Sequence, residues 1–170
     1  MYGNNVFVEY WNRPQATLDT FVTINGINWF KTGDVVVVDE HGRYWIKGRQ
    51  SADIIKSSGY KISSLDVEQV LLQHPLVSEV AVFGVTDEVY GERVVAMIVP
   101  KKSVSYGVEE EKKLKDELEV KRLREWGDNL IARYKLPTVV KLVDELPRNA
   151  MGKINKKMLS KEFKNPTSVV

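Results

Sequence analysis

The sequence contains no cysteine and only two histidines, which excludes several kinds of site. Without cysteine, a disulfide framework and a thiolate zinc site are impossible, and no feature indicates an oxidising compartment. His41 lies in a predicted turn and His74 directly precedes Pro75, so each is expected to be structural or solvent-facing rather than a ligand. We therefore predict no metal site in this chain and an intracellular location.

Long apolar runs and a strong excess of one charge are missing as well. No run approaches the roughly 18 apolar residues of a membrane-spanning helix, and the first residues lack the apolar stretch of a signal peptide. Acidic and basic residues alternate and the net charge is +2, which argues only weakly for a nucleic-acid partner. With 170 residues, 43% of them hydrophobic, the chain can bury a real core. We predict a globular chain with no membrane span and no nucleic-acid partner.

Strand signals dominate the first part of the chain. Residues 35–38 and 44–46 are rich in β-formers and are joined by the turn sequence Asp39-Glu40-His41-Gly42, which predicts a hairpin. Residues 7–10 and 21–24 are shorter strand candidates. We expect residues 1–49 to consist of β-hairpins.

From residue 50 onward the pattern is mixed. Ser57-Ser58-Gly59 predicts a tight turn between two short strands, and Ser63 with Asp66 predicts a helix N-cap. Further strands are predicted at residues 80–83, 94–99 and 139–143, a long helix at residues 108–134 and a short one at residues 156–163. The fold class is therefore α+β: a domain at residues 50–165 with two or three strands and helices on one side, then a disordered tail at residues 166–170.

Lys153 is the best candidate for a positioned catalytic charge. It follows Gly152 in a stretch too irregular for a helix face. A lysine brings a compact positive charge on a flexible stem, which suits a transient phosphate or carboxylate, and a glycine lets the backbone approach a ligand closely. The alternative is a solvated lysine in a surface turn. The segment is not a phosphate-binding P-loop, because Pro147 and Ile154 occupy positions that need glycine and Ser/Thr.

Asp34 and Arg49 flank the predicted hairpin. Asp34 follows Gly33 and could accept both hydroxyl groups of a ribose, although a turn or strand cap would use the same residue. Arg49 follows Gly48, and its planar guanidinium suits hydroxyl, carboxylate or phosphate groups, or a surface ion pair.

Taken together, the motifs carry a family resemblance through their order and spacing. They are Thr32-Gly33-Asp34, then Gly48-Arg49 with Asp53-Ile54-Ile55-Lys56 and Gly59-Tyr60-Lys61-Ile62, then Pro147-Arg148-Asn149 with Gly152-Lys153-Ile154. The chain resembles the last third of the adenylate-forming (AMP-binding) enzymes, which include acyl-CoA synthetases, over nearly all of its length. Within them, residues 51–56 and 59–63 look most like malonyl-CoA synthetases.

This resemblance implies a function and a division of the chain. Residues 1–49 would be the tail of a large adenylating domain, including part of its barrel, and residues 50–165 a mobile lid. The parent enzyme would join a carboxylic acid to CoA with ATP, through acyl-AMP, with malonate as a possible acid. ATP or AMP and CoA would be the bound small molecules, and Mg²⁺ would be held by residues outside this chain.

The resemblance also implies residue roles. Lys153 would act in adenylation, Asp34 and Arg49 would hold the ribose, and the loop Ser57-Ser58-Gly59 would line the CoA channel. The lid would turn about Gln50 and Ser51, although Ser51 stands where the family has aspartate or lysine.

The ATP-phosphate loop of the family is absent from the sequence, so the chain alone is expected to be inactive and to need a large N-terminal domain. The parent would be cytoplasmic or mitochondrial. Two alternatives stay open: a stand-alone module that docks on or regulates a separate adenylating subunit, and nucleic-acid contact through the basic residues 153–157.

Overall fold

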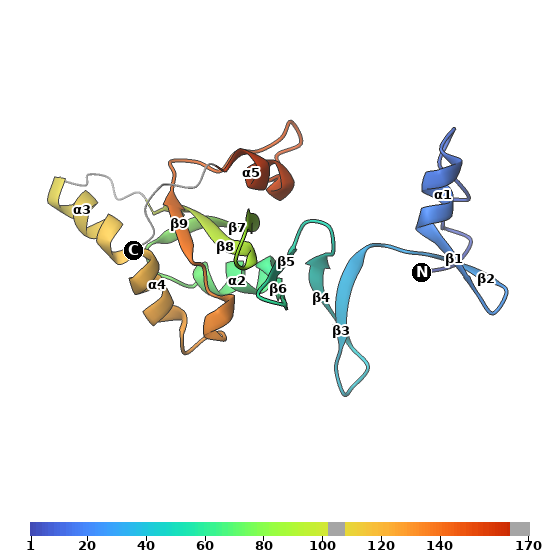
Figure 1. Ribbon diagram of the computed structural model, residues 1–170, viewed down its shortest axis with the longest axis horizontal. Coiled ribbons are helices and arrows are strands. Elements are labelled where there is room, and N and C mark those ends of the chain that lie inside the picture. Colours follow the sequence, from blue (N-terminus) through green and yellow to red (C-terminus); the bar gives the residue numbers. More distant parts are fainter. Residues whose placement is uncertain (102–107, 164–170) are drawn as a thin grey trace. The chain divides into compact units, whose positions relative to one another are not determined.

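The computed structural model describes residues 1–101 and 108–163, and these divide into two compact units, one at residues 1–34 and one from residue 35 onward (Figure 1). The elements follow in the order α1 Pro14–Thr20, β1 Phe21–Ile24, β2 Ile27–Phe30, β3 Asp34–Val38, β4 Tyr44–Arg49, β5 Ile54–Ser57, β6 Tyr60–Ser63, α2 Ser64–Leu71, β7 Val77–Asp87, β8 Gly91–Pro100, α3 Val108–Glu117, α4 Val120–Gly127, the 3-10 turn η1 Arg133–Lys135, β9 Val139–Leu142 and α5 Lys156–Glu162.

The first unit is a helix followed by a hairpin. β1 and β2 pair antiparallel through a two-residue turn, so the strand predicted at residues 21–24 is confirmed. The strand predicted at residues 7–10 is wrong: that segment has no regular structure, and Phe7 instead packs its ring against Phe21 and Phe30 at centroid distances of 5.5 and 5.3 Å. The helix α1 was not predicted either, since it buries no residue and therefore shows no apolar period.

The second unit is built on a five-stranded sheet in the order β6-β5-β8-β7, with β9 also paired to β8. β7 and β8 form its long antiparallel centre, and β9 joins β8 in parallel. The tight turn predicted between β5 and β6 is confirmed, with positive φ at Ser58 (49°) and Gly59 (81°). The predicted hairpin of β3 and β4 is also present, as a separate two-stranded sheet. Among the described strands no barrel closes.

Helices cover both faces of this sheet, which corrects the prediction that they lie on one side (Figure 1). Residues of β7 and β8 alternate between two cores. Val80, Val82 and Ile98 face a core shared with α2 and α4, whereas Phe83 and Met97 face a core shared with α5. Because successive strand residues point to opposite faces, strands that are apolar at every position need cover on both sides.

The long helix predicted at residues 108–134 is in fact two helices and a 3-10 turn. α3 ends at Glu117, α4 begins at Val120, and Glu119 between them is extended with ψ 153°. Leu118 and Leu123 are both 1% exposed in the same core. Residues five apart on one straight helix point about 140° apart, so the break is needed for both leucines to face the sheet.

The remaining predictions are close to the structure. The Ser63 hydroxyl accepts the Asp66 amide at 3.1 Å and caps α2, and the strand at 139–143 and the terminal helix are present. The tail predicted at residues 166–170 lies outside the described residues, and the domain boundary between residues 49 and 50 stays a prediction. Among the described helices, none is long and apolar enough to cross a membrane.

Candidate nucleotide and acyl-transfer site

Lys153 lies at the end of a tight turn whose backbone is well defined. The Asn149 carbonyl accepts the Gly152 amide at 2.8 Å, and the Asn149 amide donates to the Lys153 carbonyl at 2.9 Å. The Asn149 side-chain oxygen accepts two further amides, from Met151 at 3.0 Å and Lys153 at 2.9 Å. Gly152 has φ +76°, which explains the glycine before the lysine. The turn therefore presents an exposed lysine on an ordered backbone.

The base of this turn is tied to the sheet. Arg148 and Ile154 form an antiparallel bridge across it, and the Arg148 guanidinium donates to the Gly152 carbonyl at 3.0 Å. Arg148 also pairs with Glu79 of β7, and Ile154 packs against the core under α5. The lysine turn is thus held at both ends, with its tip in solvent.

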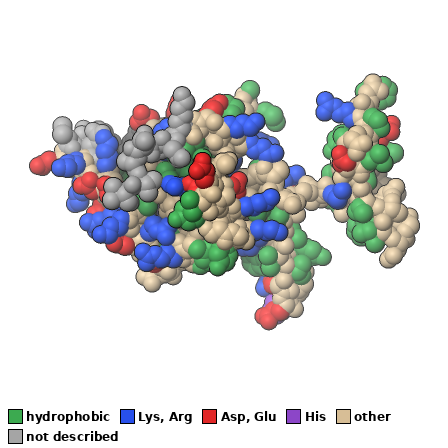
Figure 2. Space-filling model, in the orientation of Figure 1, with side chains coloured by type: hydrophobic (Ala, Val, Ile, Leu, Met, Phe, Trp, Pro, Cys, Tyr) green, Lys and Arg blue, Asp and Glu red, His purple; other side chains and the backbone are tan. Residues whose placement is uncertain are grey.

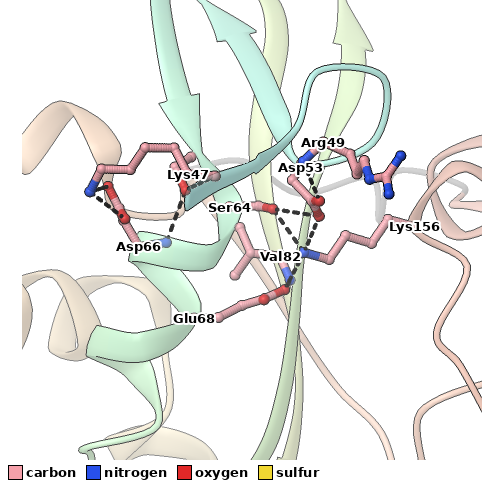
Figure 3. A network of polar contacts seen from close by, with 9 residues as sticks. Lys47, Arg49, Asp53, Ser64, Asp66, Glu68, Val82 and Lys156 are labelled. Atoms are coloured by element: carbon pink, nitrogen blue, oxygen red, sulfur yellow. Dashed lines mark hydrogen bonds and ion pairs between the residues drawn. The ribbon is translucent and has the colours of Figure 1, made fainter. Parts of the chain in front are cut away.

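Arg49 ends β4 and leads into a second turn, at Gln50 and Ser51 before β5. The Arg49 carbonyl accepts the amides of Ala52 at 3.1 Å and Asp53 at 2.8 Å. The Asp53 carboxylate in turn accepts the Arg49 amide at 2.8 Å. The Arg49 guanidinium extends away from this carboxylate, and Arg49, Gln50 and Ser51 are exposed (Figure 3). The predicted hinge therefore lies in a turn closed by Asp53.

Lys156, the first residue of α5, connects these two turns (Figure 3). Its ammonium donates to Asp53 Oδ1 at 2.9 Å and to Ser64 Oγ at 2.8 Å. It also pairs with Glu68 Oε1 at 2.9 Å. A lysine has three N–H donors, and here each has one acceptor. The side chains of Lys156, Asp53 and Glu68 are only 11%, 15% and 14% exposed. We call these residues, with Ser64, the Lys156 cluster.

The two carboxylates of the Lys156 cluster respond differently to burial. For Asp53, burial alone would raise the pKa, but the Arg49 amide and Lys156 outweigh it and leave the pKa below its usual value. For Glu68, burial raises the pKa above its usual value, and Lys156 and the Val82 amide only partly oppose it. Glu68 Oε1 accepts that amide at 2.7 Å, which ties α2 to β7. One ammonium between two acids holds α2, α5 and the turn before β5 together.

The sequence analysis named Asp53 only as part of a motif and Lys156 only within the basic residues 153–157. Its burial removes Lys156 from the proposed nucleic-acid surface. Figure 2 shows Lys and Arg side chains spread over the visible face of the second unit, with acidic side chains between them. One signal was available: a cation in the first turn of a helix opposes the helix dipole, so Lys156 needed a specific partner.

The other predicted site residues lie at strand ends or in the turn between β5 and β6. Asp34 begins β3, and its amide donates to the Thr32 hydroxyl at 3.1 Å after Gly33 at φ +76°. The turn Ser57-Ser58-Gly59 is attached to the sheet, since the Ser58 amide donates to the Tyr90 carbonyl at 2.8 Å. A Cβ added to Gly59 would meet nothing within 4 Å, so within this chain its φ of +81°, and not crowding, requires glycine.

No three His, Asp or Glu side chains within residues 1–101 and 108–163 gather as a possible metal site.

The lysine turn lies on a small sheet covered by helices and is linked to the Gly-Arg turn through Lys156 and Asp53. The family model described as AMP-binding enzyme C-terminal domain matches residues 66–153, just over half of the chain. The chain therefore belongs to this family, and the predicted family is confirmed.

Individual relatives are CoA ligases. The mitochondrial malonate–CoA ligase of Homo sapiens is 47% identical over 95% of this chain and 25% of its own length. The malonate–CoA ligase of Arabidopsis thaliana is 48% identical over 95% of this chain and 26% of its own. The chain thus spans about a quarter of the length of these curated relatives.

Solved structures agree with this fold. A crystal structure of ATP-bound MatB from Rhodopseudomonas palustris has a TM-score of 0.75 at 31% identity, over 94% of this chain and 29% of that one. The o-succinylbenzoate CoA synthetase MenE of Bacillus subtilis, in complex with its acyl-adenylate intermediate, has a TM-score of 0.70 at 34% identity, over 95% of this chain and 30% of that one.

Proposed function

We propose that this chain forms the C-terminal part of an ATP-dependent acyl-CoA synthetase that acts on malonate. The observation that carries the proposal is the 47% identity with a malonate–CoA ligase over 95% of the chain. The exposed, ordered lysine turn at Lys153 supports it, because the proposed chemistry needs a positive charge brought to a crowded anionic centre.

The reaction has two steps. In the first, a carboxylate oxygen of the acid attacks the α-phosphorus of ATP, and the bond to the leaving pyrophosphate breaks. In the second, the thiol of CoA gives its proton to water, its sulfur attacks the acyl carbonyl, and AMP leaves with the electron pair of the broken C–O bond. In the first step the negative charges of the attacking carboxylate and of the triphosphate meet at one centre, so a cation placed there lowers that barrier.

We assign each residue one role in these steps. The Lys153 ammonium would lie between the attacking carboxylate and the α-phosphate. Asp34 and Arg49 would hold the two ribose hydroxyls, since a carboxylate accepts and a guanidinium donates hydrogen bonds. The turn Ser57-Ser58-Gly59 would line the CoA channel during the second step, after rotation about Gln50 and Ser51.

The proposed activity needs a large adenylating domain that supplies the ATP loop, the acyl pocket and the ligands of Mg²⁺. For this reason we expect the chain by itself not to turn over. We infer an intracellular parent enzyme, in the cytoplasm or in mitochondria; one curated relative is named as mitochondrial.

The test compares the chain joined to its large domain with the chain alone. With ATP, CoA and malonate, the joined protein should form malonyl-CoA, AMP and pyrophosphate, with much less product from acetate or a long-chain acid. The 170-residue chain alone should form none. A joined protein that forms no thioester from any carboxylic acid would exclude the enzyme, and an adenylating subunit activated by the separate chain would favour the docking-module alternative.

A further inference from the structure

We propose that Lys156 is a positioning residue that sets the place of Lys153 by fastening the lysine turn to the Arg49 turn. This inference deepens the proposed function and rests on it. Lys156 stands three residues after Lys153, and its ammonium reaches Asp53 at 2.9 Å, four residues after Arg49. The two turns are distant in sequence, and this contact spans 103 residues of chain.

The Lys156 cluster is built to resist displacement. All three ammonium donors are used, by Asp53, Ser64 and Glu68. The Ser64 backbone amide also donates to the Asp53 carbonyl at 2.8 Å, so the two residues are held together by main chain as well. A partly exposed lysine that could rotate freely would not locate a loop, whereas this side chain is 11% exposed.

The link from the cluster to Lys153 is short and stiff. Asn155 caps α5 by accepting the Met158 amide at 3.2 Å, so the backbone entering the helix is ordered. Ile154 lies between the two lysines and is bridged to Arg148. A displacement of the Lys156 backbone would therefore also displace the lysine turn. Since misplacement of a catalytic group by about 1 Å can lower a rate about 100-fold, the location of this turn matters to the first step.

The cluster also reaches the predicted hinge from the other side. Asp53 uses one carboxylate oxygen for Lys156 and the other for the Arg49 amide, at 2.8 Å. The lysine turn and the turn that carries the hinge residues thus share one carboxylate. During rotation of the lid, Lys153 would move as a unit with Asp53 rather than as a loose loop.

The test uses the full-length enzyme and measures the two steps separately. Adenylation is followed by exchange of labelled pyrophosphate into ATP with malonate present, and thioester formation by release of AMP from supplied malonyl-AMP and CoA. Lys156→Met should slow adenylation about 100-fold and leave thioester formation within about threefold. Lys157→Ala, at the exposed neighbouring residue, should leave both steps unchanged.

A second variant separates positioning from stability, because Lys156→Met leaves two buried acids without their cation. Lys156→Met with Glu68→Gln removes one charge of each sign and keeps an acceptor for the Val82 amide. The double variant should regain thermal stability but not adenylation, since the ammonium is still missing. Recovery of adenylation together with stability, or equal loss in both steps, would overturn the positioning role.

Two outcomes distinguish this inference from the proposed function. In a Lys153→Ala background, Lys156→Met should cause no further loss of adenylation; independent, multiplying losses would contradict the link. If Lys153→Ala itself leaves adenylation intact, the role proposed for Lys153 fails instead, whereas a full-length protein that forms no thioester would exclude the proposed function. Amide hydrogen exchange then still tests whether Lys156 holds the lysine turn in place. Lys156→Met should speed the exchange of the Lys153 amide about tenfold or more, while the amides of β7 keep their exchange rates. An unchanged rate at Lys153 would refute the positioning role.

Discussion

Gly48 and Asp53 lie so close together that a Cβ built on the glycine would stand 2.5 Å from the Asp53 Cβ. Gly48 also has φ +118°, a conformation that side chains rarely adopt. The Gly-Arg pair that the sequence presents as a possible ligand motif therefore has a structural cause as well. Asp53 can reach Arg49 and Lys156 only because Gly48 leaves it room.

Gly48→Ala should consequently lower the free energy of unfolding by at least about 2 kcal/mol, from backbone strain and overlap with Asp53. Gly42→Ala is the matched control, with φ +76° and nothing within 4 Å of an added Cβ, and should cost about 1 kcal/mol. Urea unfolding followed by circular dichroism measures both. Equal losses would show that overlap with Asp53 contributes nothing.

Leu71 and Leu72 test the core under α2. Leu71 is completely buried, whereas Leu72 beside it is 48% exposed. Leu71→Ala should lower the free energy of unfolding by about 2–5 kcal/mol, because it removes buried methyl groups and leaves a cavity. Leu72→Ala should change it by less than about 0.5 kcal/mol. Similar losses in the same urea experiment would mean that α2 does not pack as the structure has it.

Asp39 makes the β3–β4 hairpin sensitive to acid. Its carboxylate accepts hydrogen bonds from Trp45 Nε1 and the Arg43 amide, both at 2.9 Å, and these lower its pKa from 3.8 to about 2. A lowered pKa means that the carboxylate stabilises the hairpin above pH 3.8 and that this contribution is lost as the pH falls towards about 2.

Trp45→Phe removes the largest cause and should raise the pKa of Asp39 towards 3.8, so the hairpin should loosen at a higher pH. Titration of the Asp39 carboxyl carbon by NMR measures the shift. Tyr44→Phe, at a residue 74% exposed, is the control and should leave this titration unchanged. A pKa that stays near 2 in Trp45→Phe would show that the indole hydrogen bond is not the main cause.

Lys153→Ala in the full-length enzyme should slow acyl-AMP formation about 100- to 1,000-fold, because the cation that meets the developing charge is lost. Thioester formation from supplied acyl-AMP should continue, since in the proposed mechanism the rotated lid would then present the Ser57-Ser58-Gly59 turn. Pyrophosphate exchange and AMP release measure the two steps, with Lys157→Ala as the control. Equal loss of both steps would contradict the division of roles between Lys153 and the Ser57-Ser58-Gly59 turn.

Much of the fold followed from local pattern. The turn at Ser58 and Gly59, the cap at Ser63 and the central strands were predicted because turn residues, caps and apolar runs act over a few residues. The break after Leu118 was not predicted, because the charged periodicity of residues 108–134 continues across it. It results from the sheet, which Leu118 and Leu123 both contact.

The sequence alone was enough to identify the family and to predict the site residues. The order and spacing of motifs such as Gly48-Arg49 and Gly152-Lys153 can be read without knowing the tertiary structure. Only the tertiary structure decided which charges belong together. Lys156 lies next to another lysine in sequence, which is typical of a surface residue, yet its side chain is buried between Asp53 and Glu68. Spacing along the chain says nothing about partners 103 residues away, since that pairing depends on how α5 packs against the sheet.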